Sequence, residues 1–143
     1  MHVTDEHVAA VRAYLRGDED TDRRLDRFSA QDAHAFAALV TAAFVEALRR
    51  RFPERWTPAV VIRFVASARS RIAEHAHEVD PRRAEALIRA ALGDGDPAAL
   101  DDETKALQAP LLLSLIQDEN LDGPGLDAFL DDARTRAERI PTT

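Results

Sequence analysis

Residues 29–53 read SAQDAHAFAALVTAAFVEALRRRFP, and the spacing of their apolar side chains decides the fold class. Ser29 and Asp32 form an S-x-x-D pattern, which is typical of the capped start of a helix. Apolar residues then recur every three or four positions, so that one continuous stripe runs to Pro53. Its members are Phe36, Leu39, Val40, Ala43, Phe44, Ala47, Leu48 and Phe52. The stretch therefore predicts one long amphipathic helix.

Similar signals mark helices on both sides of this one. A polar cap followed by proline predicts helix starts at Thr57 and Asp80, and glycine predicts helix ends at Gly17 and Gly93. The expected helical segments are residues 4–16, a short piece presenting Leu25 and Phe28, residues 29–53, 57–72, 80–92, 102–119 with a kink or restart at Pro110, and a last helix introduced by Gly123-Pro124-Gly125. No alternating run is long enough for a strand. We predict an all-α fold, a single bundle of six to seven helices forming one domain over residues 1–143.

The two halves of the chain resemble each other, which predicts an internal duplication. Residues 64–71 (FVASARSR) align with residues 129–136 (FLDDARTR), and residues 11–15 (VRAYL) align with 88–92 (IRAAL). Both members of the second pair lead into Gly-Asp-x-Asp, and the matching elements follow the same order. We interpret residues 4–75 and 81–140 as two pseudo-symmetric three-helix halves. Chance similarity between Ala/Arg-rich helices is the alternative.

Composition limits the chemistry. The chain has 143 residues, of which 45% are apolar and 31% charged, so it can fold as an ordinary globular domain. It has no cysteine, which excludes disulfides, thiolate zinc sites and thiol catalysis. The sequence shows neither a leader-like start nor an apolar run of membrane-spanning length. We therefore expect a soluble, cytoplasmic protein that does not enter a membrane.

Charge is distributed unevenly along the chain. The net charge is −7, yet residues 44–92 carry ten arginines against six acids, and residues 93–143 carry four basic residues against twelve acids. The densest basic segment is Arg49, Arg50, Arg51 and Arg55, with the single Trp56 beside it. Arginine and tryptophan are common in interfaces, which predicts a surface for an anionic partner. The alternative is structural: the arginines would complement the helix dipole and the aromatic residues would close the core.

Two motifs could in principle bind a metal, and both are incomplete. Residues 118–123 (DENLDG) match the opening of a calcium loop, but Phe129 stands where the bidentate glutamate is needed, which favours an interhelical turn. Residues 74–78 (EHAHE) contain Glu-x-x-His, but the second motif and the further glutamates of a di-iron site are missing. We expect the acidic clusters 18–22 and 101–103 to be solvated helix ends. The sequence thus predicts no metal and no cofactor.

Three functions remain open on the sequence. The favoured hypothesis is a non-catalytic interaction or regulatory module that binds another protein through Arg49, Arg50, Arg51, Arg55 and Trp56. The alternatives are a nucleic-acid-binding regulator that uses basic residues 49–71, and an enzyme or small-ligand binder with a pocket between the two halves. The acidic net charge makes nucleic acid the weaker hypothesis. No catalytic residues can be nominated, and the oligomeric state and partner stay open.

Overall fold

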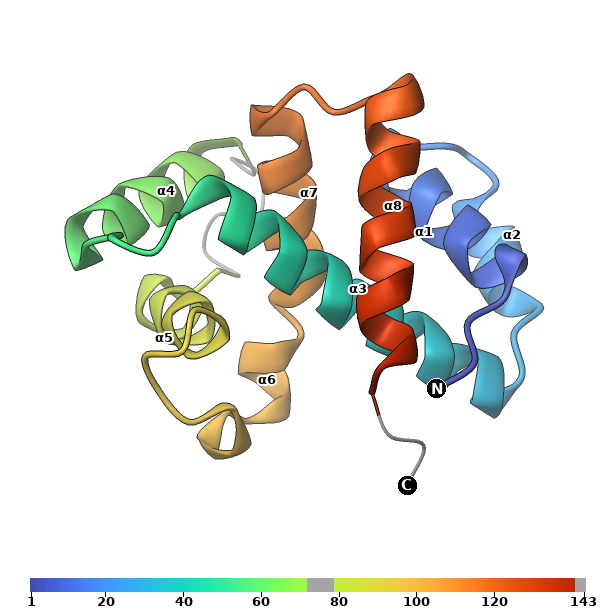
Figure 1. The fold of residues 1–143 in the computed structure, drawn as a ribbon, viewed down its shortest axis with the longest axis horizontal. Helices are drawn as coiled ribbons and strands as arrows, with labels where there is room; N and C mark the ends of the chain where they lie inside the picture. Colours follow the sequence, from blue (N-terminus) through green and yellow to red (C-terminus); the bar gives the residue numbers. More distant parts are fainter. Residues whose placement is uncertain (72–78, 141–143) are drawn as a thin grey trace. The chain divides into compact units, whose positions relative to one another are not determined.

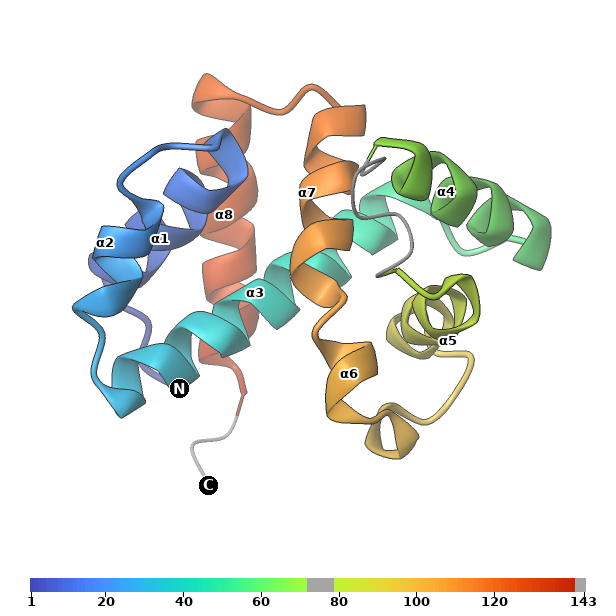
Figure 2. The same ribbon diagram turned by 180° about the vertical axis from the view of Figure 1, so that it is seen from behind.

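The computed structural model describes residues 1–71 and 79–140, and these are helical with no strand, which confirms the all-α class (Figures 1 and 2). Among the residues described, six helices have eleven or more residues, and α2 and α6 are short. In chain order the elements are α1 (Asp5–Arg16), α2 (Thr21–Asp26), α3 (Ala30–Arg51), α4 (Pro58–Arg71), α5 (Pro81–Ala91), the 3-10 turn η2 (Pro97–Ala99), α6 (Asp102–Lys105), α7 (Gln108–Asp118) and α8 (Gly123–Glu138).

Helix starts follow the predicted caps. The Ser29 hydroxyl accepts a hydrogen bond from the Asp32 N–H at 3.1 Å, and the Asp32 carboxylate accepts one from the Ser29 N–H at 3.2 Å. Asp80 caps α5 by accepting from the N–H groups of Arg82 and Arg83. These bonds satisfy backbone donors that the first turn of a helix leaves without a partner.

The helix expected at residues 102–119 is divided into α6 and α7. Ala106 and Leu107 separate the two helices, and Pro110 is the third residue of α7. Proline has no N–H to donate to the Ala106 carbonyl, and its ring would clash with that carbonyl in a continuous helix. In the first turn of a new helix the missing N–H costs nothing, because that position has no intrahelical acceptor. The restart at Pro110, rather than the kink, is what the structure contains.

The described chain forms two compact units. Unit 1 consists of Met1–Glu46 and Ile116–Thr143, and in it α1 packs on α2 and on α8 (Figure 1). Unit 2 is Ala47–Leu115, and in it α5 packs on α4, η2 and α6 (Figure 2). The helices α3 and α7 each contribute residues to both units. The unit boundaries therefore differ from the predicted halves, since each half supplies segments to both units.

Burial repeats between the predicted halves. Most apolar positions that the alignment matches are buried in both members of a helix pair, although Leu15 is buried and its counterpart Leu92 is half-buried. The matched buried residues are, for α4 and α8, Val61, Phe64, Val65 and Ala68 against Leu126, Phe129, Leu130 and Ala133, and, for α1 and α5, His7, Ala10, Val11 and Ala13 against Ala84, Leu87, Ile88 and Ala90.

Helix pairing repeats as well, with an exchange of partners. α1 of the first half packs on α8 of the second half, and α5 of the second half packs on α4 of the first. Both α1 and α5 end at a left-handed glycine, Gly17 (φ 71°) and Gly93 (φ 92°), and the following N–H in each case bonds to the carbonyl five residues earlier. These regularities favour the duplication, which stays a prediction together with the single domain.

Candidate interaction site

The arginine corner comprises Arg49, Arg50, Arg51, Arg55 and Trp56, and it lies where α3 gives way to α4 in unit 2. The first three arginines occupy the last turn of α3, where a positive charge complements the helix dipole. All four arginines are exposed, and Trp56 is half-buried. The arginines of the corner therefore complement the dipole of α3 and at the same time form an exposed, positively charged surface.

Aromatic packing holds the corner in place. Phe52 is buried, and its ring meets the ring of Phe64 on α4 edge to face, with centroids 5.8 Å apart. The Arg51 guanidinium lies 5.5 Å from the centre of the Phe52 ring, within cation–π range. A turn closed by the Trp56 N–H on the Pro53 carbonyl then leads into α4. Because the buried Phe52 packs on Phe64, it fixes the backbone of the turn that carries the neighbouring arginines.

Positive charge continues from the corner along α4. Residues 49–71 contain seven arginines (Arg49, Arg50, Arg51, Arg55, Arg63, Arg69 and Arg71) and one acid, Glu54, so the segment carries a net charge of 7 − 1 = +6. Within the described residues no hydrogen bond or ion pair involves the side chains of Arg49, Arg55 or Arg63, and all three are exposed. Their charge is therefore available to a partner.

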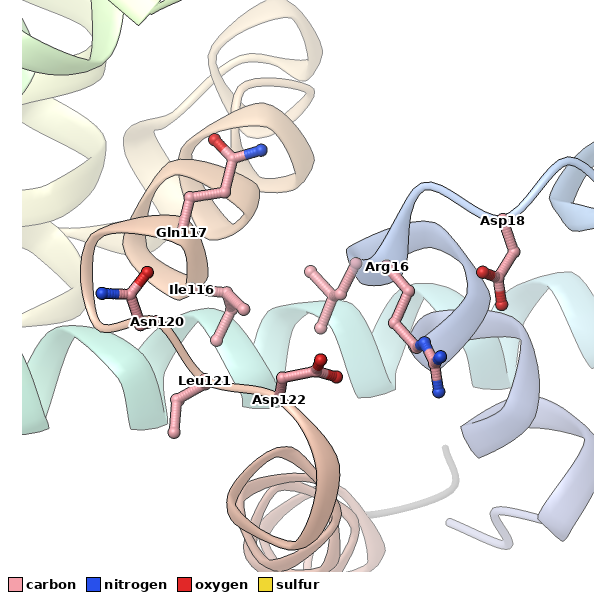
Figure 3. Close-up of a pocket in the computed structure, with 8 residues that line it drawn as sticks. Arg16, Asp18, Ile116, Gln117, Asn120, Leu121 and Asp122 are labelled. Atoms are coloured by element: carbon pink, nitrogen blue, oxygen red, sulfur yellow. The ribbon is translucent and has the colours of Figure 1, made fainter.

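The sequence matching a calcium loop forms a turn between α7 and α8. Asn120 adopts a left-handed conformation (φ 50°), and Asp122 is the N-cap of α8. This turn and the end of α1, which supplies Arg16 and Asp18, line an open hollow of about 480 Å³ (Figure 3). In the part of the chain that the structure describes, no three His, Asp or Glu side chains are grouped so that they could hold a metal ion. The loop thus has the geometry of the interhelical turn.

The other acidic motifs have structural roles where they are described. Asp101 caps α6 by accepting from the Thr104 N–H at 2.8 Å, and the Arg83 guanidinium binds both Glu103 and Asp101. In the first cluster, Asp20 pairs with Arg24 at 2.8 Å. The Glu-x-x-His motif at residues 74–78 lies outside the described residues.

A polar network that the sequence analysis missed joins the starts of α1 and α3. His7 is 3% exposed. Its Nδ1 accepts from the Thr4 N–H at 3.0 Å, and its Nε2 lies 2.9 Å from Asp32 Oδ1. Because Nδ1 accepts a hydrogen bond, the ring proton must be on Nε2, which donates to Asp32. Asp32 also caps α3 through Ser29, so one carboxylate fixes the first turns of two helices.

The same hydrogen bonds set the charge state of Asp32. The bond from the His7 ring, followed by those from the Ser29 N–H and hydroxyl, lowers the pKa of the Asp32 carboxyl below its usual value. Edge-to-face contact between His7 and Phe28, with centroids 5.6 Å apart, closes the apolar side of the network. We assign this network a structural role, because each of its polar groups is engaged in a helix cap.

Comparison of the chain with protein-family models, curated proteins and solved structures found no match. None of the described helices combines the length and the apolar character needed to cross a membrane. Among the described residues, the arginine corner is a dense cluster of exposed basic side chains, and Arg49 and Arg55 in it form no side-chain hydrogen bond or ion pair.

Proposed function

We propose that this protein is a non-catalytic interaction module that binds an acidic segment of another protein through the arginine corner. One observation carries the proposal: residues 49–71 hold a net charge of +6 in a chain whose net charge is −7, and three of their arginines are exposed without an intramolecular partner. Arginine binds carboxylates with two parallel hydrogen bonds, so an acidic peptide matches this surface.

The predicted duplication supports a specialised role for the corner. The long helix of the first half, α3, ends in Arg49, Arg50 and Arg51, whereas its predicted counterpart α7 ends in Gln117 and Asp118, followed by Glu119. Both helices bury apolar residues, but their C-terminal ends carry opposite charge. A scaffold that keeps its core while one surface changes sign is what recruitment of that surface for binding would produce. A cytoplasmic location is part of the proposal, and fractionation of producing cells tests it.

Affinity capture from a nuclease-treated lysate of the source cells tests the proposal. The tagged chain should retain a protein partner, and reversal of Arg49, Arg50 and Arg51 to glutamate should abolish that capture. The matched control reverses Arg16, Arg27 and Arg139, which are exposed, also lie at helix C-termini and have no recorded side-chain partner among the described residues. Both triple variants change the net charge by the same amount.

Capture that survives reversal of the corner, or that both triple variants lose equally, would refute this location for the interface. If binding appears only without nuclease treatment, nucleic acid is the partner and residues 49–71 serve the alternative function.

A further inference from the structure

Ile62 is the one large apolar side chain that is strongly exposed among the described residues, at 52%. It lies on α4 before Arg63, at the edge of the face that buries Val61, Phe64 and Val65. A single exposed isoleucine on a surface needs no explanation by itself. Ile62 lies in the first turns of α4, within residues 49–71, the basic segment that also contains the arginine corner, and this setting makes its exposure notable.

The equivalent place in unit 1 shows what Ile62 replaces. The predicted duplication matches Ile62 on α4 with Asp127 on α8, and Arg89 on α5 with Arg12 on α1. In unit 1, Arg12 Nε lies 2.9 Å from Asp127 Oδ1, so an ion pair joins the two packed helices. In unit 2 that pair is absent because Ile62 carries no charge, and Arg89 instead binds Asp94 at 2.6 Å in the turn after α5. Unit 2 therefore has an uncovered apolar side chain where unit 1 has a paired acid.

We propose that Ile62 is the apolar anchor of the same binding surface, and that its occupant is an amphipathic acidic helix of a partner protein. The inference rests on the proposed function and adds the class of ligand. Arg49, Arg55 and Arg63 lie before and after the anchor in the chain and have no recorded side-chain partner among the described residues, so carboxylates on the ligand complement them. An apolar ligand residue then covers Ile62.

Charge and apolar contact have separable roles in this arrangement. Exposed arginines attract an acidic ligand over a distance that salt shortens, so they govern the salt dependence of binding. Contact with Ile62 removes apolar area from water and is insensitive to moderate salt. An acidic ligand without an apolar residue would therefore bind weakly, and changing Ile62 would not weaken it further.

The test uses two synthetic helical peptides and the full chain. The first peptide places glutamate on one face and leucine on the other over about four turns, and in the second each leucine is replaced by serine. Fluorescence anisotropy at low and moderate salt gives the affinities. A DNA duplex is the third probe, and sedimentation of the chain alone reports self-association.

Ile62→Ser should weaken binding of the leucine-containing peptide about tenfold, the loss expected for half an isoleucine buried at an interface. It should leave the serine peptide unaffected. Isoleucine and serine have similar helix propensities, so the fold is retained. Leu25→Ser, on the half-buried side of α2 in unit 1, is the control. Replacing Arg49, Arg55 and Arg63 with glutamine should instead weaken the salt dependence, because it halves the net charge of residues 49–71.

Each other outcome overturns the inference in a distinguishable way. If the arginine variant loses binding and Ile62→Ser does not, the apolar anchor is wrong and the proposed function stands. If the duplex binds more tightly than either peptide through the same arginines, both proposals fail. If no peptide binds and the chain associates with itself through Ile62, the occupant is a second copy; if nothing binds, the surface is not a site for an acidic helix.

Discussion

His7 offers the sharpest test of the network that joins α1 and α3. His7→Ala removes a buried ring that accepts from the Thr4 N–H at 3.0 Å and lies 2.9 Å from the Asp32 carboxylate. These two hydrogen bonds contribute about 2 kcal/mol together. The edge-to-face contact with Phe28 adds about 1 kcal/mol. We expect the variant to lose about 3 kcal/mol of unfolding free energy.

Urea unfolding followed by circular dichroism measures this loss. The control is His34→Ala, because His34 lies exposed on α3 with no recorded partner among the described residues and undergoes the same change of side chain. The control should lie within about 0.5 kcal/mol of the parent protein. A loss below about 1 kcal/mol for His7→Ala, or equal losses for the two variants, would refute the reasoning that His7 is a structural link.

Two further predictions follow from local geometry. Folding lowers the pKa of Asp32, so the ionised carboxylate stabilises the folded state above the ordinary pKa of about 3.9. This stabilisation is lost as the pH falls through the lower pKa of the folded state. Asp32→Asn should therefore flatten the decline of stability in acid, and an unchanged acid-unfolding curve would contradict this. Gly17→Ala should cost about 1 kcal/mol of unfolding free energy, because Gly17 has φ 71°, although a new Cβ would meet no neighbouring atom. Gly125→Ala should stabilise the protein by about 0.5 kcal/mol, because Gly125 lies in α8 and a new Cβ would meet Leu121 at an ordinary 3.5 Å. Chemical denaturation of both variants checks that the two effects have opposite signs.

Much of the fold could be predicted from the sequence, because its signals are local. Caps at Ser29 and Asp80 and the apolar spacing of α3 act within one or two turns, so their consequences can be derived without tertiary information. Pro110 does not by itself distinguish a kinked helix from a restarted one, since proline is compatible with both, and the structure shows a restart. The pairing of buried His7 with the partly exposed Asp32 could not be found this way, because those residues are 25 positions apart.

The site was predictable in part. The sequence alone shows that Arg49, Arg50 and Arg51 are adjacent. It also shows that Ile62 does not fit the helical spacing of the other apolar residues in its segment. The sequence does not reveal which arginines form ion pairs, because these pairs depend on tertiary contacts. The Arg12–Asp127 ion pair, whose aspartate corresponds to Ile62 in the predicted duplication, likewise depends on the packing of α1 on α8.

The exchanged pairing of α1 with α8 and of α4 with α5 has a consequence for the history of the chain. On the predicted duplication, a single ancestral half would have carried its first and third helices without the surfaces that cover them. Two identical polypeptides would supply those surfaces to each other about a two-fold axis. On the same prediction, fusion of their genes would make that association intramolecular, so this share of the stability would no longer depend on protein concentration. It would also free the two formerly identical exteriors to diverge, one toward arginine and the other toward aspartate.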